Sequence, residues 1–163
     1  MESDWQFRLA EAMITASRGC LPGTCVAYVS DDPFPDFQCQ KGCTCWVAAT
    51  IVESVDLACD FSGEGADISL WYGICQSASK DGVPVPARSS AVALTGSVAR
   101  RAINRGVVTG LRSGAFAAAV PGFGDCFADG AISVSPWQPA RRATLGESLS
   151  CHVWSCVWRF RTT

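Results

Sequence analysis

The sequence predicts a mainly α-helical fold: a small disulfide-stapled module over residues 1–85, then a weakly ordered tail over residues 86–163 that is rich in Ala, Gly and Arg. Three observations predict it. Seven of the ten cysteines lie between Cys20 and Cys75, a density typical of small domains stabilised by cross-links. Three segments of the first half space their apolar residues as a helix does. In the second half, cysteine is absent until Cys126 and glycine is frequent.

The first predicted helix covers residues 3–17. Ser3 followed by Gln6 resembles a capping box. The apolar side chains share one face of the helix: Trp5, Leu9, Ala12, Met13 and Ala16. The polar face lacks the Lys and Arg of a membrane-surface helix, so the apolar face is expected to pack into a core.

The chain turns after this helix. Residues 25–30 fit either one more helical turn or a short strand. Residues 31–36 cannot form regular helix, because Pro33 and Pro35 and the residues before them require an extended or turned path.

Two further helices are expected over residues 45–59 and 66–79. The apolar stripe of the first consists of Val47, Ile51, Val55 and Ala58. The apolar residues of the second are Ile68, Leu70, Trp71 and Ile74. A loop at 62–65 separates the two.

The tail contains one segment with helical character. Residues 90–104 can form a helix with Leu94, Val98 and Ala102 on one side. Residues 106–124 carry five glycines without a clear hydrophobic period, so we expect this stretch to be loosely ordered.

Charge and hydropathy exclude two classes of partner. A net charge of −2 argues against a dedicated nucleic-acid-binding protein. No uncharged apolar run approaches the roughly 20 residues needed to span a bilayer, so no transmembrane segment is predicted.

The expected location follows from the cysteines. Ten cysteines favour an extracellular or cell-surface protein, although the first residues are acidic and do not resemble a signal peptide. The alternative is a cytoplasmic protein whose thiols stay reduced.

The disulfide candidates are Cys20, Cys25, Cys39, Cys43, Cys45, Cys59 and Cys75. Their odd number leaves one cysteine, which we expect to be Cys43, free or paired with the tail. Zinc binding by the cluster at 39–45 is the alternative, but a structural zinc site normally needs a second pair at similar local spacing, and the next cysteines along the chain, Cys59 and Cys75, stand alone. No catalytic residue is predicted: His152 adjoins Cys151 in sequence, whereas a catalytic dyad requires the two side chains to meet in space.

The cysteine spacing suggests a family. Thirteen residues separate Cys45 from Cys59 and fifteen separate Cys59 from Cys75. Together with Cys20, Cys25 and the segment Asp36-Phe37-Gln38-Cys39-Gln40, this spacing resembles the CFEM domain, a cysteine-rich module of fungal extracellular membrane proteins. The resemblance covers residues 18–85 and implies a helical basket that binds haem, with Asp36 as the ligand to the haem iron.

Three functions are compatible with these patterns. The first is a secreted or cell-surface cysteine-rich binding protein of fungal type, carrying haem or acting as an effector, with a small molecule or a host protein as partner. The second is a small tailoring enzyme that uses the thiols of Cys43 and Cys45. The third is a truncated gene product without independent activity.

Overall fold

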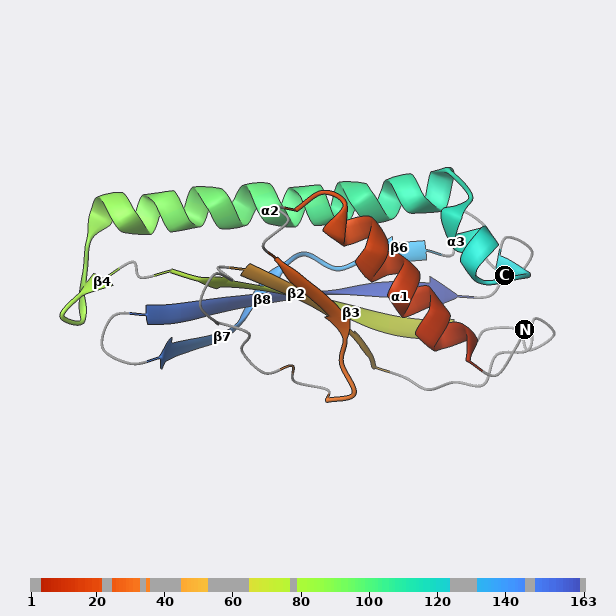
Figure 1. Cartoon of the computed structure of the whole chain (residues 1–163), viewed down its shortest axis with the longest axis horizontal. Helices are drawn as coiled ribbons and strands as arrows, with labels where there is room; N and C mark the ends of the chain where they lie inside the picture. Colours follow the sequence, from red (N-terminus) through yellow and green to blue (C-terminus); the bar gives the residue numbers. More distant parts are fainter. Residues whose placement is uncertain are drawn as a thin grey trace.

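The computed structural model describes residues 4–21, 25–32, 35, 45–52, 65–76, 79–123, 132–145 and 149–161. Within these ranges the chain forms a mixed six-stranded sheet with helices packed on it, so the predicted mainly α fold is wrong (Figure 1). The helices are α1 (Trp5–Arg18), α2 (Pro86–Arg112) and α3 (Ala115–Ala119). The strands are β1 (Val26–Val29), β2 (Cys45–Ile51), β3 (Gly65–Cys75), β4 (Ser79–Lys80), β5 (Val83–Pro84), β6 (Ile132–Val134), β7 (Gln138–Leu145) and β8 (Leu149–Arg161).

The main sheet has the strand order β1-β2-β3-β8-β6, and β7 also pairs with β8. The β1–β2 pair is parallel and the other pairs are antiparallel. β3 and β8 pair from Gly65↔Arg161 to Cys75↔Cys151, and the opposite edge of β8 is shared by β7 and β6. Strands from the two predicted parts of the chain therefore form the centre of one sheet.

The two segments expected to be the second and third helices contain strands β2 and β3. Their backbones are buried on both faces of the sheet, so both faces carry apolar side chains and the alternation that marks a half-buried strand is missing. Trp46 and Val47 show this, because they are neighbours that belong to separate hydrophobic clusters. Gly73 lies opposite Trp46, and a side chain at Gly73 would overlap the indole ring.

The helix predictions are partly correct. Helix α1 confirms the helix expected at 3–17, and α2 confirms and extends the one expected at 90–104. The loose stretch expected at 106–124 is wrong, because α2 continues to Arg112 and α3 follows. Two of its glycines permit close packing: a Cβ at Gly106 would press on the backbone of α1, and one at Gly110 would press on a phenylalanine ring.

The predicted weak order of the tail is also wrong. β8 is the longest strand, at 13 residues, and pairs along its length with β3. Residues 25–30 contain strand β1, one of the two forms expected there.

A hydrophobic core lies on each face of the sheet. The larger core contains side chains of α1, α2 and α3 and the sheet face beneath them, including Leu9, Met13 and Ile103. Figure 1 shows α1 crossing the strands and α2 running along the length of the molecule. The smaller core consists of Trp46, Ala48, Trp71, Cys75, Cys151 and Val153. The Trp71 indole in this second core donates a 2.9 Å hydrogen bond to the Thr50 hydroxyl.

The cysteine-rich chain contains disulfide bonds. Cys25 and Cys45 are joined, which ties the start of β1 to the start of β2, and Cys75 is also disulfide-bonded. Cys20 carries a free thiol, contrary to its predicted cross-link. Cys39, Cys43 and Cys59 lie outside the described residues. None of the helices described here is both long and apolar enough to cross a membrane.

Candidate functional site

The N-terminal half of α2 extends beyond α1, as Figure 1 shows. In the C-terminal half, Ile103 and Val107 are fully buried. In the N-terminal half, Leu94 and Val98 are 68% and 55% exposed, although both are large apolar residues. A cavity lies on each flank of this half of the helix, above Ile74 of β3.

The first cavity, named here the Leu94 cavity, has a volume of about 350 Å³. Its apolar walls include Leu21, Ile74, Leu94, Val98 and Ala102. Polar groups are contributed by Tyr72, Gln76, Thr95 and the Cys20 thiol. A concave apolar surface with a small number of polar groups is the usual character of a small-molecule site.

Tyr72 is the most buried of the polar residues that line the Leu94 cavity. The residue is 1% exposed, and burial raises its pKa to about 12. The phenol therefore keeps its proton at physiological pH and can donate a hydrogen bond. Within the described part of the chain, no hydrogen bond to this hydroxyl is found.

The second cavity, the Arg100 cavity, has a volume of about 260 Å³ and lies on the opposite flank of α2. Its lining includes Arg100, His152 and Trp154. The Arg100 guanidinium carbon lies 3.9 Å from the centroid of the Trp154 ring, a cation–π contact. Gly96 makes room for this arrangement, because a Cβ there would lie 3.0 Å from a guanidinium nitrogen.

Arg100, which lines one cavity, and Tyr72, which lines the other, affect each other's pKa. Burial lowers the pKa of Arg100, and the nearby Tyr72 opposes this shift. Arg100 in turn acts to lower the pKa of Tyr72, against the larger effect of burial. The two side chains thus lie in one partly desolvated environment beneath Gly96.

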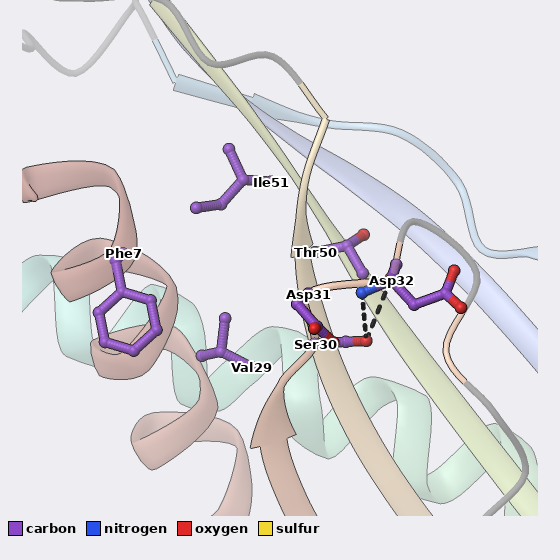
Figure 2. A pocket seen from close by; sticks show the side chains of 7 residues that line it. All are labelled: Phe7, Val29, Ser30, Asp31, Asp32, Thr50 and Ile51. Carbon is purple, nitrogen blue, oxygen red and sulfur yellow. Dashed lines mark hydrogen bonds between the residues drawn. The ribbon is translucent and has the colours of Figure 1, made fainter.

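A third cavity, of about 320 Å³, lies between α1 and the ends of β1 and β2 (Figure 2). Phe7, Val29 and Ile51 form its apolar side. On its other side, the Ser30 hydroxyl accepts from the Asp32 amide and donates to the Asp32 carbonyl, both at 3.1 Å. Figure 2 shows the Asp32 carboxylate pointing away from Phe7, so this acidic turn is explained by local hydrogen bonding.

The structure places the site residues predicted from the sequence at different positions. Asp36, the predicted haem ligand, lies outside the described residues. Cys20 and Cys45 both line the Leu94 cavity, Cys45 through its disulfide with Cys25. Cys151 and His152 point to opposite faces of the sheet, so this pair forms no catalytic dyad.

The sequence reasoning missed Tyr72, Arg100 and Trp154. These residues come from β3, α2 and β8, and only the pairing of β3 with β8 brings them together. Tyr72 and Trp154 are register partners in that pairing. The available sequence signal was the pair Leu94 and Val98, apolar residues four apart on a helix face that the core does not cover.

Comparison with known proteins assigns no family. No protein-family model and no curated protein matches the chain. The resemblance to the CFEM domain therefore stays a prediction. Among the described residues, no group of three or more His, Cys, Asp and Glu side chains is placed to hold a metal ion.

Proposed function

We propose that this protein is a cysteine-rich binding protein whose ligand occupies the Leu94 cavity. The observation that carries the proposal is an apolar cavity of about 350 Å³ with the buried Tyr72 phenol in its wall. The exposed Leu94 and Val98 side chains at this cavity gain an apolar partner when a ligand binds. The Cys25–Cys45 disulfide stabilises the adjoining strands and so keeps the cavity preformed.

The chemistry of the walls defines the class of ligand. The lining is mostly aliphatic, so the ligand is a small apolar molecule. Tyr72 stays protonated, so the ligand carries a hydrogen-bond acceptor such as a carbonyl or ether oxygen. Binding is expected to depend little on salt, because none of the cavity's lining residues is charged.

A naphthalene ketone whose fluorescence depends on polarity, such as prodan, tests this proposal. We expect a blue shift on binding, and an affinity about fivefold lower in Tyr72→Phe, the loss of one hydrogen bond. Ala102→Leu fills the Leu94 cavity and is expected to lower affinity about tenfold, or 1.4 kcal/mol.

Ala93→Leu is the matched control, because it makes the same change on the same helix but in the Arg100 cavity. Equal losses in the two leucine variants would contradict the proposal. Protection of the Cys20 thiol from N-ethylmaleimide by the ketone, followed on its peptide, gives a second readout.

Haem binding by Asp36 is a separate proposal that rests on the CFEM resemblance alone. Its test is a haemin titration followed near 400 nm in wild type and Asp36→Ala, with Asp31→Ala as the control. A loss confined to Asp36→Ala supports iron ligation by this carboxylate, and identical spectra exclude it.

A further inference from the structure

The Arg100 cavity lies between α2 and the sheet, and all of its lining residues belong to the described part of the chain. The helix contributes Ser89, Val92, Ala93, Gly96 and Arg100. The spacing from Ala93 to Gly96 and Arg100 is that of residues on one face of a helix. Regular helix backbone therefore fixes this side of the cavity.

The sheet forms the other side of the cavity through Ile74, His152 and Trp154. Ile74 and His152 are register partners in the pairing of β3 with β8, and Trp154 follows two residues later. Paired residues share a face of a sheet, as do residues two apart in one strand, so these three side chains lie on one face. Both sides of the cavity thus belong to regular secondary structure, which favours a preformed site.

The positive charge of Arg100 has no carboxylate partner among the described residues. Helix α2 contains five Arg and no Asp or Glu, and β8 also contains neither acid. The acidic residue of β3, Asp67, is paired with Arg159 and Arg161. The three elements that line the cavity therefore supply no counter-ion to Arg100.

The guanidinium of Arg100 is placed to receive an anion. Its contact with Trp154, at 3.9 Å from the ring centroid, uses one face of the guanidinium. The N–H donors lie in the plane of the group, where two of them can match the two oxygens of a carboxylate. Burial lowers the pKa of Arg100 because water is partly excluded, and the same exclusion strengthens its attraction for an anion.

We propose that the Arg100 cavity binds a small organic carboxylate, whose oxygens accept hydrogen bonds from the Arg100 guanidinium. A volume of about 260 Å³ admits one ring or a short aliphatic chain together with the carboxylate. Ile74, Val92 and Ala93 provide apolar surface for that body, which an inorganic anion would not cover. This site is separate from the Leu94 cavity, whose proposed ligand is uncharged.

Titration of the full-length protein with para-fluorobenzoate, followed by fluorine NMR, tests the proposal. The neutral isostere para-fluorobenzamide has nearly the same shape without the charge, and we expect it to bind about tenfold more weakly. Added salt should weaken binding of the acid and leave that of the amide unchanged. Inorganic phosphate at equal concentration should not displace the acid.

Arg100→Gln removes the charge and is expected to lower the affinity for the acid about tenfold, to the level of the amide. Arg101→Gln is the matched control, because it makes the same change in net charge at the next, exposed position of α2. Ala93→Leu fills the Arg100 cavity and should also lower the affinity about tenfold, or 1.4 kcal/mol. Ala102→Leu, which fills the Leu94 cavity, should leave it unchanged.

Equal binding of the acid and the amide by the wild-type protein overturns the proposal, and this comparison decides even if Arg100→Gln folds poorly. Equal losses in the two glutamine variants, or in the two leucine variants, overturn it as well. Displacement of the acid by inorganic phosphate would show that the site selects charge alone, which contradicts an organic carboxylate. Because the two leucine variants exchange roles between prodan and the acid, failure at one cavity leaves the test of the other intact.

Discussion

The guanidinium of Arg100 stacks on the indole of Trp154, 3.9 Å from the ring centroid, and so joins α2 to the central strand β8. This contact anchors the part of α2 that α1 does not reach. The same arginine shares its environment with the buried Tyr72 on the other side of the helix. This pair therefore adds a contact between α2 and the sheet beside the two cavities.

Replacement of Arg100 should reveal the strength of the contact. Arg100→Ala is expected to lower the free energy of unfolding by about 1–2 kcal/mol, through loss of the cation–π contact and of packing by the arginine stem. Arg101→Ala, a change at the next, exposed position of the helix, should have an effect below about 0.5 kcal/mol. Urea denaturation of the two variants measures the difference, and equal midpoints would show that the stacking contributes nothing.

Parts of the fold could be predicted from the sequence because their signals are local. The apolar face of α1 and the helical spacing in α2 lie within single segments, and both helices were found. The strands β2 and β3 were misassigned because both of their faces are buried, which leaves a run of apolar residues that fits either period. Helix and strand cannot be separated in such runs without knowledge of the partner strand.

The candidate site could not be predicted for a related reason. β8 is stabilised by pairing with β3, about 80 residues earlier in the chain, and no local pattern encodes that pairing. The sequence prediction assigned the residues of β8 to a weakly ordered tail. It therefore could not place Trp154 and His152 near Tyr72. The cysteine pattern did identify Cys25 and Cys45 as disulfide candidates, but spacing alone does not give the connectivity.

Two glycines of α2 should respond differently to alanine. Alanine favours a helix over glycine by about 1 kcal/mol. At Gly106 this gain is outweighed, because the new Cβ would lie 2.5 Å from the backbone oxygen of Ala16 and α1 would have to move. We expect Gly106→Ala to destabilise the protein by about 2 kcal/mol, within the usual cost of overpacking.

Gly96→Ala is the control within the same helix. Its nearest contact is the flexible end of Arg100, at 3.0 Å, which can move aside at low cost. The gain in helix propensity should then offset the loosened contact with Trp154, so the net change stays within about 0.5 kcal/mol. Thermal or urea unfolding of both variants tests this, and a Gly106→Ala protein as stable as wild type would mean that the two helices are not closely packed.

The thiols of Cys20 and Cys156 should differ in reactivity. Cys20 is exposed, whereas burial raises the pKa of Cys156 to about 12. Since the thiolate is the reactive form, iodoacetamide at pH 8 should modify Cys20 in the native protein and leave Cys156 unmodified. Peptide mass mapping gives both extents, with a urea-unfolded sample as the control in which both react. Rapid modification of Cys156 in the native protein would place it outside the core.

Alkaline pH should destabilise the protein through Tyr72. Its pKa rises from 10.0 to about 12 on folding because burial disfavours the phenolate. Between these values the unfolded chain releases the tyrosine proton and the folded chain keeps it, so the free energy of unfolding falls as pH rises. This stability is fully present below pH 10, and about 2–3 kcal/mol of it is lost by pH 12.

Tyr72→Phe removes this contribution, because phenylalanine has no proton to lose. The difference in free energy of unfolding between wild type and Tyr72→Phe should therefore be constant below pH 9.5 and shift in favour of the variant above pH 10. Burial also raises the pKa of Cys156 to about 12, but that loss is common to both proteins and cancels in the comparison. Parallel curves for wild type and Tyr72→Phe up to pH 12 would show that the Tyr72 hydroxyl is hydrated in the folded protein, and the wall of the Leu94 cavity would then lack its buried donor.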